Sequence, residues 1–252
     1  MNFLDLTLPT PAENLAADEA LLDWRDEEGG GEILRFWESP VPFVVVGYAN
    51  KVATESNVRA CAEHEIPILR RCSGGGTVLQ GPGCLNYSLI LKITEGGPLA
   101  GITSANRIIM ERNRAALEAA ARSPNAKLTI SVNGHTDLAL RTQHSAPATA
   151  LKFSGNAQRR KKRFLLFHGT FLLHFDLPLI EKFLAMPSLE PDYRHGRGHP
   201  EFITNLPLSA DSVKRALCTA WDTVGPLENC PLARIQLLAR DRYVTNGWNF
   251  KL

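Results

Sequence analysis

The sequence predicts an α+β fold, and two observations carry this prediction. Segments typical of strands and segments typical of helices are both present, but they do not alternate as in a doubly wound sheet. The stretch 127–175 is rich in strand-forming residues and carries turn signals at Asn133-Gly134 and Gly155-Asn156. The chain has 252 residues, of which 44% are hydrophobic. This size suits one large domain or two small ones.

The first third of the chain predicts one long helix followed by strands. Thr10 can cap this helix, Pro11 suits its first position, and Glu13 provides the carboxylate of a capping box. The helix is expected to end at the glycines 29–31. Further along, the pattern predicts strands at 33–37, 43–46 and 66–71, with a short helix at 55–65.

The rest of the chain contains a regular strand and two more helices. Apolar residues alternate over 85–93, which predicts a half-buried strand. The Ala-, Glu-, Arg- and Leu-rich segment 103–122 predicts a long helix, and Ser209 is placed to cap a last one.

Charge and cysteine content exclude several classes of protein. With 28 Lys and Arg against 26 Asp and Glu, the net charge is +2, so neither nucleic acid nor a membrane is the expected partner. The longest weakly polar run, 164–175, is much shorter than the ~20 residues that span a bilayer. The N-terminus lacks the pattern of a signal peptide. Five scattered cysteines without a CxxC pair predict no disulfide framework and a cytoplasmic location.

A run of three glycines follows the strand expected at 66–71, in the sequence RRCSGGGT. Glycines allow backbone N–H groups to approach a ligand closely, and the adjacent Arg70 and Arg71 suit a carboxylate or phosphate. A flexible hairpin loop with solvated arginines explains the same residues equally well. The motif is neither a Walker A loop nor a dinucleotide-binding GxGxxG.

Two single residues are weaker candidates. Lys152 lies between apolar neighbours before a Ser-Gly pair, and a partly buried lysine needs a counter-charge or a ligand. A solvated lysine at a strand end is the common alternative. His168 shares one strand face with Thr170, where a histidine satisfied by a hydroxyl is frequent in protein cores.

Four segments, in this order and spacing, resemble the lipoate-protein ligase A family of the biotin and lipoate ligase superfamily: RRCSGGGTVLQGPGCLNYS, NGHTDLAL, LKFSGNAQ and FHGTFLL. Further matches are NLAADEALL, FVVVGYANKVATESN, GHPEFITNL and YVTNGWNF. The resemblance covers essentially the whole chain. It implies one catalytic domain over 1–252, with a mixed, largely antiparallel sheet flanked by helices as in class II synthetases. Family ligases often carry an accessory domain after this point, and we expect this protein to lack it.

The resemblance implies that lipoate or octanoate is activated by ATP to an acyl-adenylate and passed to a lysine of an acceptor domain. ATP and Mg²⁺ would then be required, with lipoate as substrate. The acceptors would be lipoyl domains of the 2-oxoacid dehydrogenase E2 or glycine cleavage H protein type. A separate protein could supply the accessory domain.

The same resemblance assigns roles to individual residues. Lys152 is the catalytic residue, where its charge offsets negative charge that develops on the carboxylate and phosphate. Asp137 holds Mg²⁺ near the phosphates or fixes Lys152. The family motif before Asp137 usually contains Arg and Asn, where this chain has His135 and Thr136. The other residues expected to border the adenylate and the acyl chain are Arg70, Arg71, Ser73, Gly74, Gly75, Gly76, Asn86, Ser154, Gly155, His168 and Thr170.

Two other functions remain open. A transferase of the same fold would move the acyl group from a carrier protein through a cysteine thioester without ATP. Related transferases have this cysteine between the positions of Asp137 and Lys152, but 141–151 contains none, and only Cys72 and Cys84 lie near the glycine motif. A non-catalytic binding module would use the basic run 159–163. In a ligase, the same run could instead attract an acidic acceptor domain.

Overall fold

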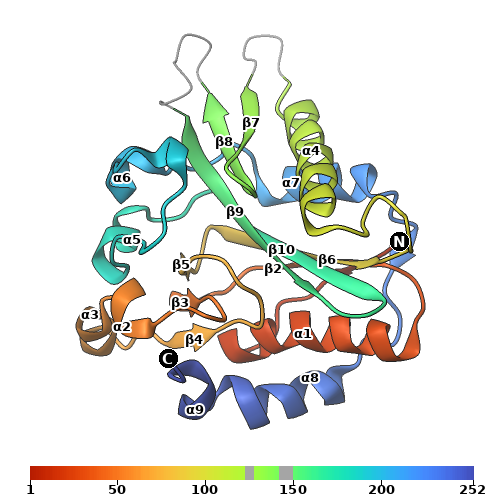
Figure 1. Ribbon diagram of the computed structural model, residues 1–252, viewed down its shortest axis with the longest axis horizontal. Helices are drawn as coiled ribbons and strands as arrows, with labels where there is room; N and C mark the ends of the chain where they lie inside the picture. The colour runs from red at the N-terminus through yellow and green to blue at the C-terminus, as the bar shows by residue number, and fades with distance from the viewer. Residues whose placement is uncertain (123–127, 142–149) are drawn as a thin grey trace.

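An eight-stranded mixed sheet forms the centre of the molecule, seen in a computed structural model that describes residues 1–122, 128–141 and 150–252 (Figure 1). The strand order is β11-β1-β2-β6-β10-β9-β8-β7. Strand β1 runs parallel to β2 and β11, and the other neighbours are antiparallel. The sheet consists of β1 (Asn2–Asp5), β2 (Ile33–Trp37), β6 (Cys84–Lys92), β7 (Thr129–Asn133), β8 (Asp137–Arg141), β9 (Leu151–Arg160), β10 (Phe164–Leu172) and β11 (Gly225–Pro226).

Helices cover both faces of this sheet. Helices α4 (Ile102–Ala120) and α7 (Ala210–Ala220) pack on one face, while α1 (Pro11–Glu28) lies on the other, backed by α8 (Leu232–Leu238) and the π-helical turn η3 (Ala239–Tyr243) (Figure 1). Alternate residues of β6 therefore reach different cores: Leu89 joins the α4 side and Ile90 the α1 side. The α+β class with a largely antiparallel sheet and flanking helices is confirmed.

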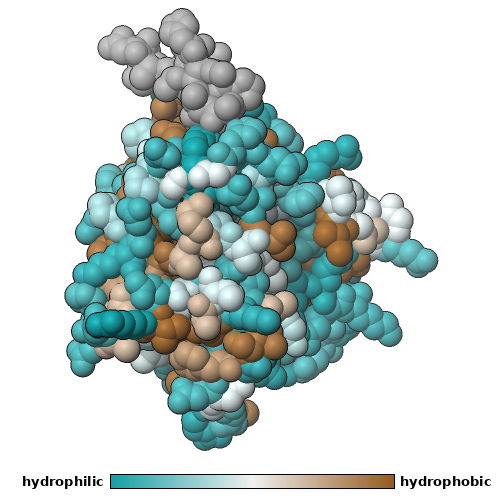
Figure 2. All heavy atoms as spheres, turned by 60° about the vertical axis from the view of Figure 1, so that its left-hand side comes forward, coloured by the Kyte–Doolittle hydropathy of each residue, from teal (hydrophilic) through white to brown (hydrophobic). Residues whose placement is uncertain are grey.

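A three-stranded sheet packs beside the main one. Its order is β4-β3-β5, formed by Ile68–Arg70, Phe43–Val46 and Val78–Gln80. Short helices surround it: α2 (Val52–Glu55), α3 (Val58–Glu63), α5 (Pro178–Phe183), the 3₁₀ turn η2 (Asp192–Arg194), α6 (His199–Phe202) and α9 (Asn246–Asn249). On the side that carries α2, α3, α5 and α6, apolar patches lie among hydrophilic side chains (Figure 2). Among the described residues, no helix is both long and apolar enough to cross a bilayer.

Local signals in the sequence located most elements. The predicted capping box exists: the Thr10 side chain accepts from the Glu13 N–H, and the Glu13 carboxylate accepts from the Thr10 N–H. Strands 33–37 and 43–46 and the helix after Ser209 are confirmed, and the long helix spans 102–120. The helix after Ser209 is not the last one, because α8, η3 and α9 follow it. Asn133-Gly134 starts the β7–β8 turn.

Three expectations were wrong in detail. The helix expected at 55–65 is two short helices, because Ser56 is extended and pairs with Leu184. Strand β6 is buried on both faces from Cys84 to Leu91 rather than half-buried, since α1 covers its second face. Gly155-Asn156 is not a turn but lies inside β9.

Candidate active site

A cavity of about 840 Å³ opens between the main sheet, the small sheet and the segment from α5 to α6. Its apolar walls include Trp37, Val45, Val78, Leu79, Leu172, Ile180 and Phe202. Its polar walls contain most of the expected site residues: Arg71, Gly75, Gly76, Asn86, Asp137, Lys152, Ser154, Gly155, His168 and Thr170. An elongated apolar chain with a polar head matches such a lining.

The strand register explains how residues distant in sequence meet here. Asp137 of β8 pairs with Gly155 of β9, Gly155 with Thr170 of β10, and Thr170 with Asn86 of β6. These four residues form one row across four strands. At one end of the row, the Thr170 hydroxyl donates to the side-chain oxygen Oδ1 of Asn86 at 2.6 Å.

Lys152 and Asp137 form an ion pair on the cavity wall, with 2.9 Å between Nζ and Oδ1. The other carboxylate oxygen of Asp137 accepts a hydrogen bond from the Tyr193 hydroxyl at 2.8 Å. The β8–β9 register shifts between Leu138 and Ala139, a bulge that re-aims side chains locally. A Cβ at Gly155 would lie 3.0 Å from Lys152 Nζ, so glycine leaves room for this side chain.

Asn156 links β9 to the turn before Asp137. Its amide donates to the Thr136 carbonyl at 2.7 Å, and the Thr136 hydroxyl donates to the Asn156 carbonyl at 2.7 Å. Its side-chain oxygen accepts from the Tyr87 hydroxyl at 2.6 Å. Thr136 therefore helps to hold Asp137 in place.

Arg71 shapes the glycine loop, Gly74–Gly76. Its guanidinium is buried and donates to the carbonyls of Gly74 and Gly76 at 2.6 and 2.7 Å. Burial lowers the pKa of Arg71 to about 10, which still leaves it charged at neutral pH. Gly75 has a φ of 86°, in the region that favours glycine. Gly75 and Gly76 line the cavity, whereas Gly74, on the same exposed loop, does not.

Arg70 does not border the cavity, which corrects its expected role. Its guanidinium is buried and donates to the backbone carbonyls of Gly47, Tyr48, Asn50, Trp248 and Asn249. With these donors engaged, Arg70 joins the C-terminal helix α9 to the small sheet. It cannot offer the same groups to a phosphate without breaking that junction.

His168 lies within a buried hydrogen-bonded chain. Its Nδ1 is 2.8 Å from an oxygen of Asp18, and its Nε2 is 2.6 Å from the Ser73 hydroxyl. Arg35 donates to the second Asp18 oxygen at 2.7 Å. Ser73 itself lies behind the cavity wall, while Asp18 and His168 line it.

The cysteines near the glycine loop are poor nucleophiles. Cys72 and Cys84 are buried, and burial raises the pKa of both thiols far above its ordinary value. All five cysteines lie in the described part of the chain, and none lines the cavity. Residues 142–149, within the segment where related transferases have their cysteine, are outside the described residues.

Asp137 does not form a ready metal site. Both of its oxygens are engaged, by Lys152 and Tyr193. In the part of the chain that the structure describes, no group of three or more His, Cys, Asp or Glu is arranged to hold a metal ion. The geometry thus fits a residue that orients Lys152 better than a resident Mg²⁺ ligand.

The basic run 159–163 lies at the other end of β9, where β9 turns into β10. Eight residues separate Lys152 from Arg160, roughly 26 Å at about 3.3 Å per residue. Lys161 pairs with Asp23 at 2.9 Å, and Arg163 donates to the Asp26 carbonyl. No residue of the run lines the cavity, although Arg159 donates to the Cys72 carbonyl beside the glycine loop at 2.7 Å.

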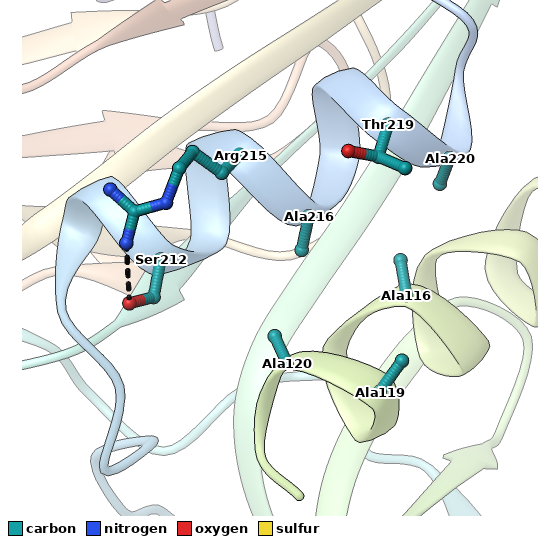
Figure 3. Close-up of a pocket in the computed structure, with 8 residues that line it drawn as sticks. All are labelled: Ala116, Ala119, Ala120, Ser212, Arg215, Ala216, Thr219 and Ala220. Carbon is teal, nitrogen blue, oxygen red and sulfur yellow. Dashed lines mark hydrogen bonds between the residues drawn. The ribbon is translucent and has the colours of Figure 1, made fainter.

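A second hollow, of about 500 Å³, lies between α4 and α7 (Figure 3). Alanines form most of its lining, and the one charged residue there, Arg215, donates to Ser212 on the same helix. This lining offers packing space and little chemistry.

Residues 10–221 match the family described as the lipoyl protein ligase A/B catalytic domain. The chain belongs to this family. A curated relative, the octanoyltransferase LipM of Halalkalibacterium halodurans, is 27% identical over 274 residues, covering 99% of this chain and 98% of the relative.

Solved structures of the family have the same fold. The bi-partite lipoate protein ligase of Thermoplasma acidophilum, from an archaeal lipoylation system, superposes with a TM-score of 0.76 at 25% identity, covering 99% of this chain and 96% of that one. A lipoate-protein ligase A bound with ATP gives 0.74 at 25% identity, covering 99% of each chain.

Sequence reasoning missed three residues of the site. Tyr193 comes from η2 and Asp18 from α1, each more than 50 positions from its partner, and no local motif signals such a contact. Asn156 was assigned to a turn. In the sequence, the signal that could have found Asp18 is its place in the segment NLAADEALL, which resembles the family.

Proposed function

We propose that this protein is an ATP-dependent lipoate-protein ligase, which activates lipoate or octanoate to an acyl-adenylate and transfers the acyl group to a lysine of a lipoyl acceptor domain. The observation that carries the proposal is Lys152, a lysine held by Asp137 on the wall of a largely apolar cavity. A fixed ammonium group stabilises negative charge where it develops during acyl transfer.

The chemistry follows from the lining of the cavity. The apolar walls receive the acyl chain and exclude water, which would hydrolyse a mixed anhydride. The Gly75 and Gly76 backbone faces the carboxylate and α-phosphate, with Arg71 holding the loop in shape. Attack of the carboxylate on the α-phosphate would release pyrophosphate from ATP, and attack of the acceptor lysine on the acyl carbon would release AMP. Mg²⁺ bound to the phosphates would offset their negative charge.

The thiols support a ligase over a thioester-forming transferase. A thioester route needs an accessible thiolate. Segment 141–151 contains no cysteine, and Cys72 and Cys84 are buried with raised pKa values. The second candidate, an octanoyltransferase, is favoured by the identity with the LipM enzyme, which extends over 99% of this chain.

Intact-mass analysis of an acceptor domain separates the two functions. One sample contains the protein, lipoate, Mg²⁺ and ATP, and the other contains octanoyl carrier protein without ATP. A ligase modifies the acceptor in the first sample only. Modification in the second sample only contradicts the proposal and identifies a transferase.

The acceptor and the conditions are tested in the same format. Lipoyl domains of the E2 and H protein types are compared as acceptors, and both are expected to react. If acyl-adenylate forms but the acceptor domain is not modified, a separate accessory-domain protein is added to the reaction. A cytoplasmic location is part of the proposal and is checked by fractionating cells.

A further inference from the structure

A buried polar network connects α1 to the glycine loop. Asp18 is 2% exposed, Arg35 0% and Ser73 1%, so water does not compete for their hydrogen bonds. Burying a carboxylate this deeply is costly unless its charge is compensated. The network therefore needs an explanation beyond packing.

The following assignment of protons satisfies every contact in this network. Burial disfavours ionisation of Asp18, but the hydrogen bond from His168 and the charge of Arg35 outweigh it and hold the pKa of that carboxyl below its ordinary value. An ionised Asp18 can only accept, so His168 carries its proton on Nδ1. Its Nε2 then accepts from the Ser73 hydroxyl. The Ser73 oxygen in turn accepts from Arg71 Nε at 3.1 Å.

Ser73 fixes the start of the glycine loop through its backbone as well. Its carbonyl accepts from the Tyr48 N–H at 2.8 Å, while its side chain joins His168 to Arg71. Arg71 also holds the carbonyls of Gly74 and Gly76. The direction of the loop N–H groups thus depends on a chain of contacts that begins at Asp18.

We propose that Asp18 is a positioning residue for acyl activation: it fixes the tautomer of His168, and through the Ser73 hydroxyl it holds the glycine loop in the geometry that receives the reacting carboxylate. This inference rests on the proposed function for its activity assay. Its structural part, the tautomer and the loop, stands independently of which acyl donor the enzyme uses.

The main test is Asp18→Asn, which keeps the size of the side chain and removes its charge. An amide can donate to His168 and so permits the Nε2–H tautomer, which leaves Ser73 without its acceptor. We expect the turnover of acyl-adenylate formation to fall about 100-fold, the size of effect that a 1 Å misplacement can have. The KM for the acid is expected to change much less, because the apolar walls are unaltered.

Two further variants keep the test informative. Glu19→Gln changes the neighbouring buried carboxylate, whose 2.9 Å contacts go to Arg242, outside the cavity lining. It should lose stability like Asp18→Asn but retain turnover within about threefold of wild type.

Ser73→Ala leaves the Asp18–His168 contact intact. It should slow activation as Asp18→Asn does, and the double variant should be no slower than either single one.

Nitrogen NMR of the His168 ring shows which ring nitrogen carries the proton, which an activity assay does not show. Wild type and Ser73→Ala should show the ring proton on Nδ1. In Asp18→Asn, at least part of the protein should instead carry the proton on Nε2. Unchanged turnover in folded Asp18→Asn, or an Nε2–H tautomer in wild type, overturns the inference. If wild type forms no acyl-adenylate, the proposed function fails, and the same variants are then assayed with octanoyl carrier protein.

Discussion

The two ends of strand β9 carry the same type of ion pair but have different surroundings. At one end Lys152 pairs with Asp137, and beyond the other end Lys161 pairs with Asp23, each at 2.9 Å. Lysine exposure is similar, 27% and 34%. The Lys152 pair lines the cavity, whereas the Lys161 pair joins the β9–β10 turn to α1.

The comparison shows that charge and pairing alone do not set Lys152 apart from Lys161. The Lys152–Asp137 pair differs in two respects. Tyr193 donates to the second carboxylate oxygen of Asp137, and Gly155 leaves space beside the Lys152 ammonium group. Ion pairs at exposed sites contribute little to stability. The predictions below test whether function follows this difference in surroundings.

The largest effect is expected from Lys152→Ala. Removing the ammonium group leaves the developing negative charge without its stabiliser, so acyl transfer to the acceptor should fall at least about 1,000-fold. Mass analysis of the acceptor and circular dichroism of the enzyme give activity and folding. Lys161→Ala is the matched control and should keep full activity. An active, folded Lys152→Ala enzyme contradicts the site assignment.

A smaller effect is expected from Asp137→Asn. The amide keeps the contact with Tyr193 but removes the charge facing Lys152, so the ammonium group is less well oriented. Turnover should fall roughly 10- to 100-fold in single-turnover assays. Asp23→Asn makes the same change beside Lys161 and should leave turnover unaltered. Equal activity of the two variants would remove the distinction between the two ends.

The smallest effect is expected from reversing two charges of the basic run, with Arg160→Glu and Lys162→Glu combined. Neither Arg160 nor Lys162 lines the cavity, so transfer to the acceptor should change less than about twofold. Arg160 donates to the Leu99 and Ala100 carbonyls, and losing these bonds should lower the free energy of unfolding by about 1 kcal/mol. Selective slowing of acceptor transfer would instead show that this end steers the acceptor domain.

Local sequence signals located the elements because their causes are local. A cap such as Thr10, a periodic helix face or an Asn-Gly turn acts over a few residues. The same reasoning failed at Gly155-Asn156, where a turn-like dipeptide lies within a strand. There the space required by Lys152 and the bonds of Asn156 across strands determine the residue types.

The sequence by itself determined the α+β class and the family, and it marked the glycine loop and Lys152 as candidates, because all of these depend on local patterns and on motifs in a fixed order. Only the tertiary structure decided which contacts neighbouring residues make. Arg70 and Arg71 are adjacent, yet one holds α9 and the other shapes the loop at the cavity. It also brought Asp18 to His168 across 150 positions. Strand register and helix packing create such contacts, and neither is encoded in any short segment of the chain.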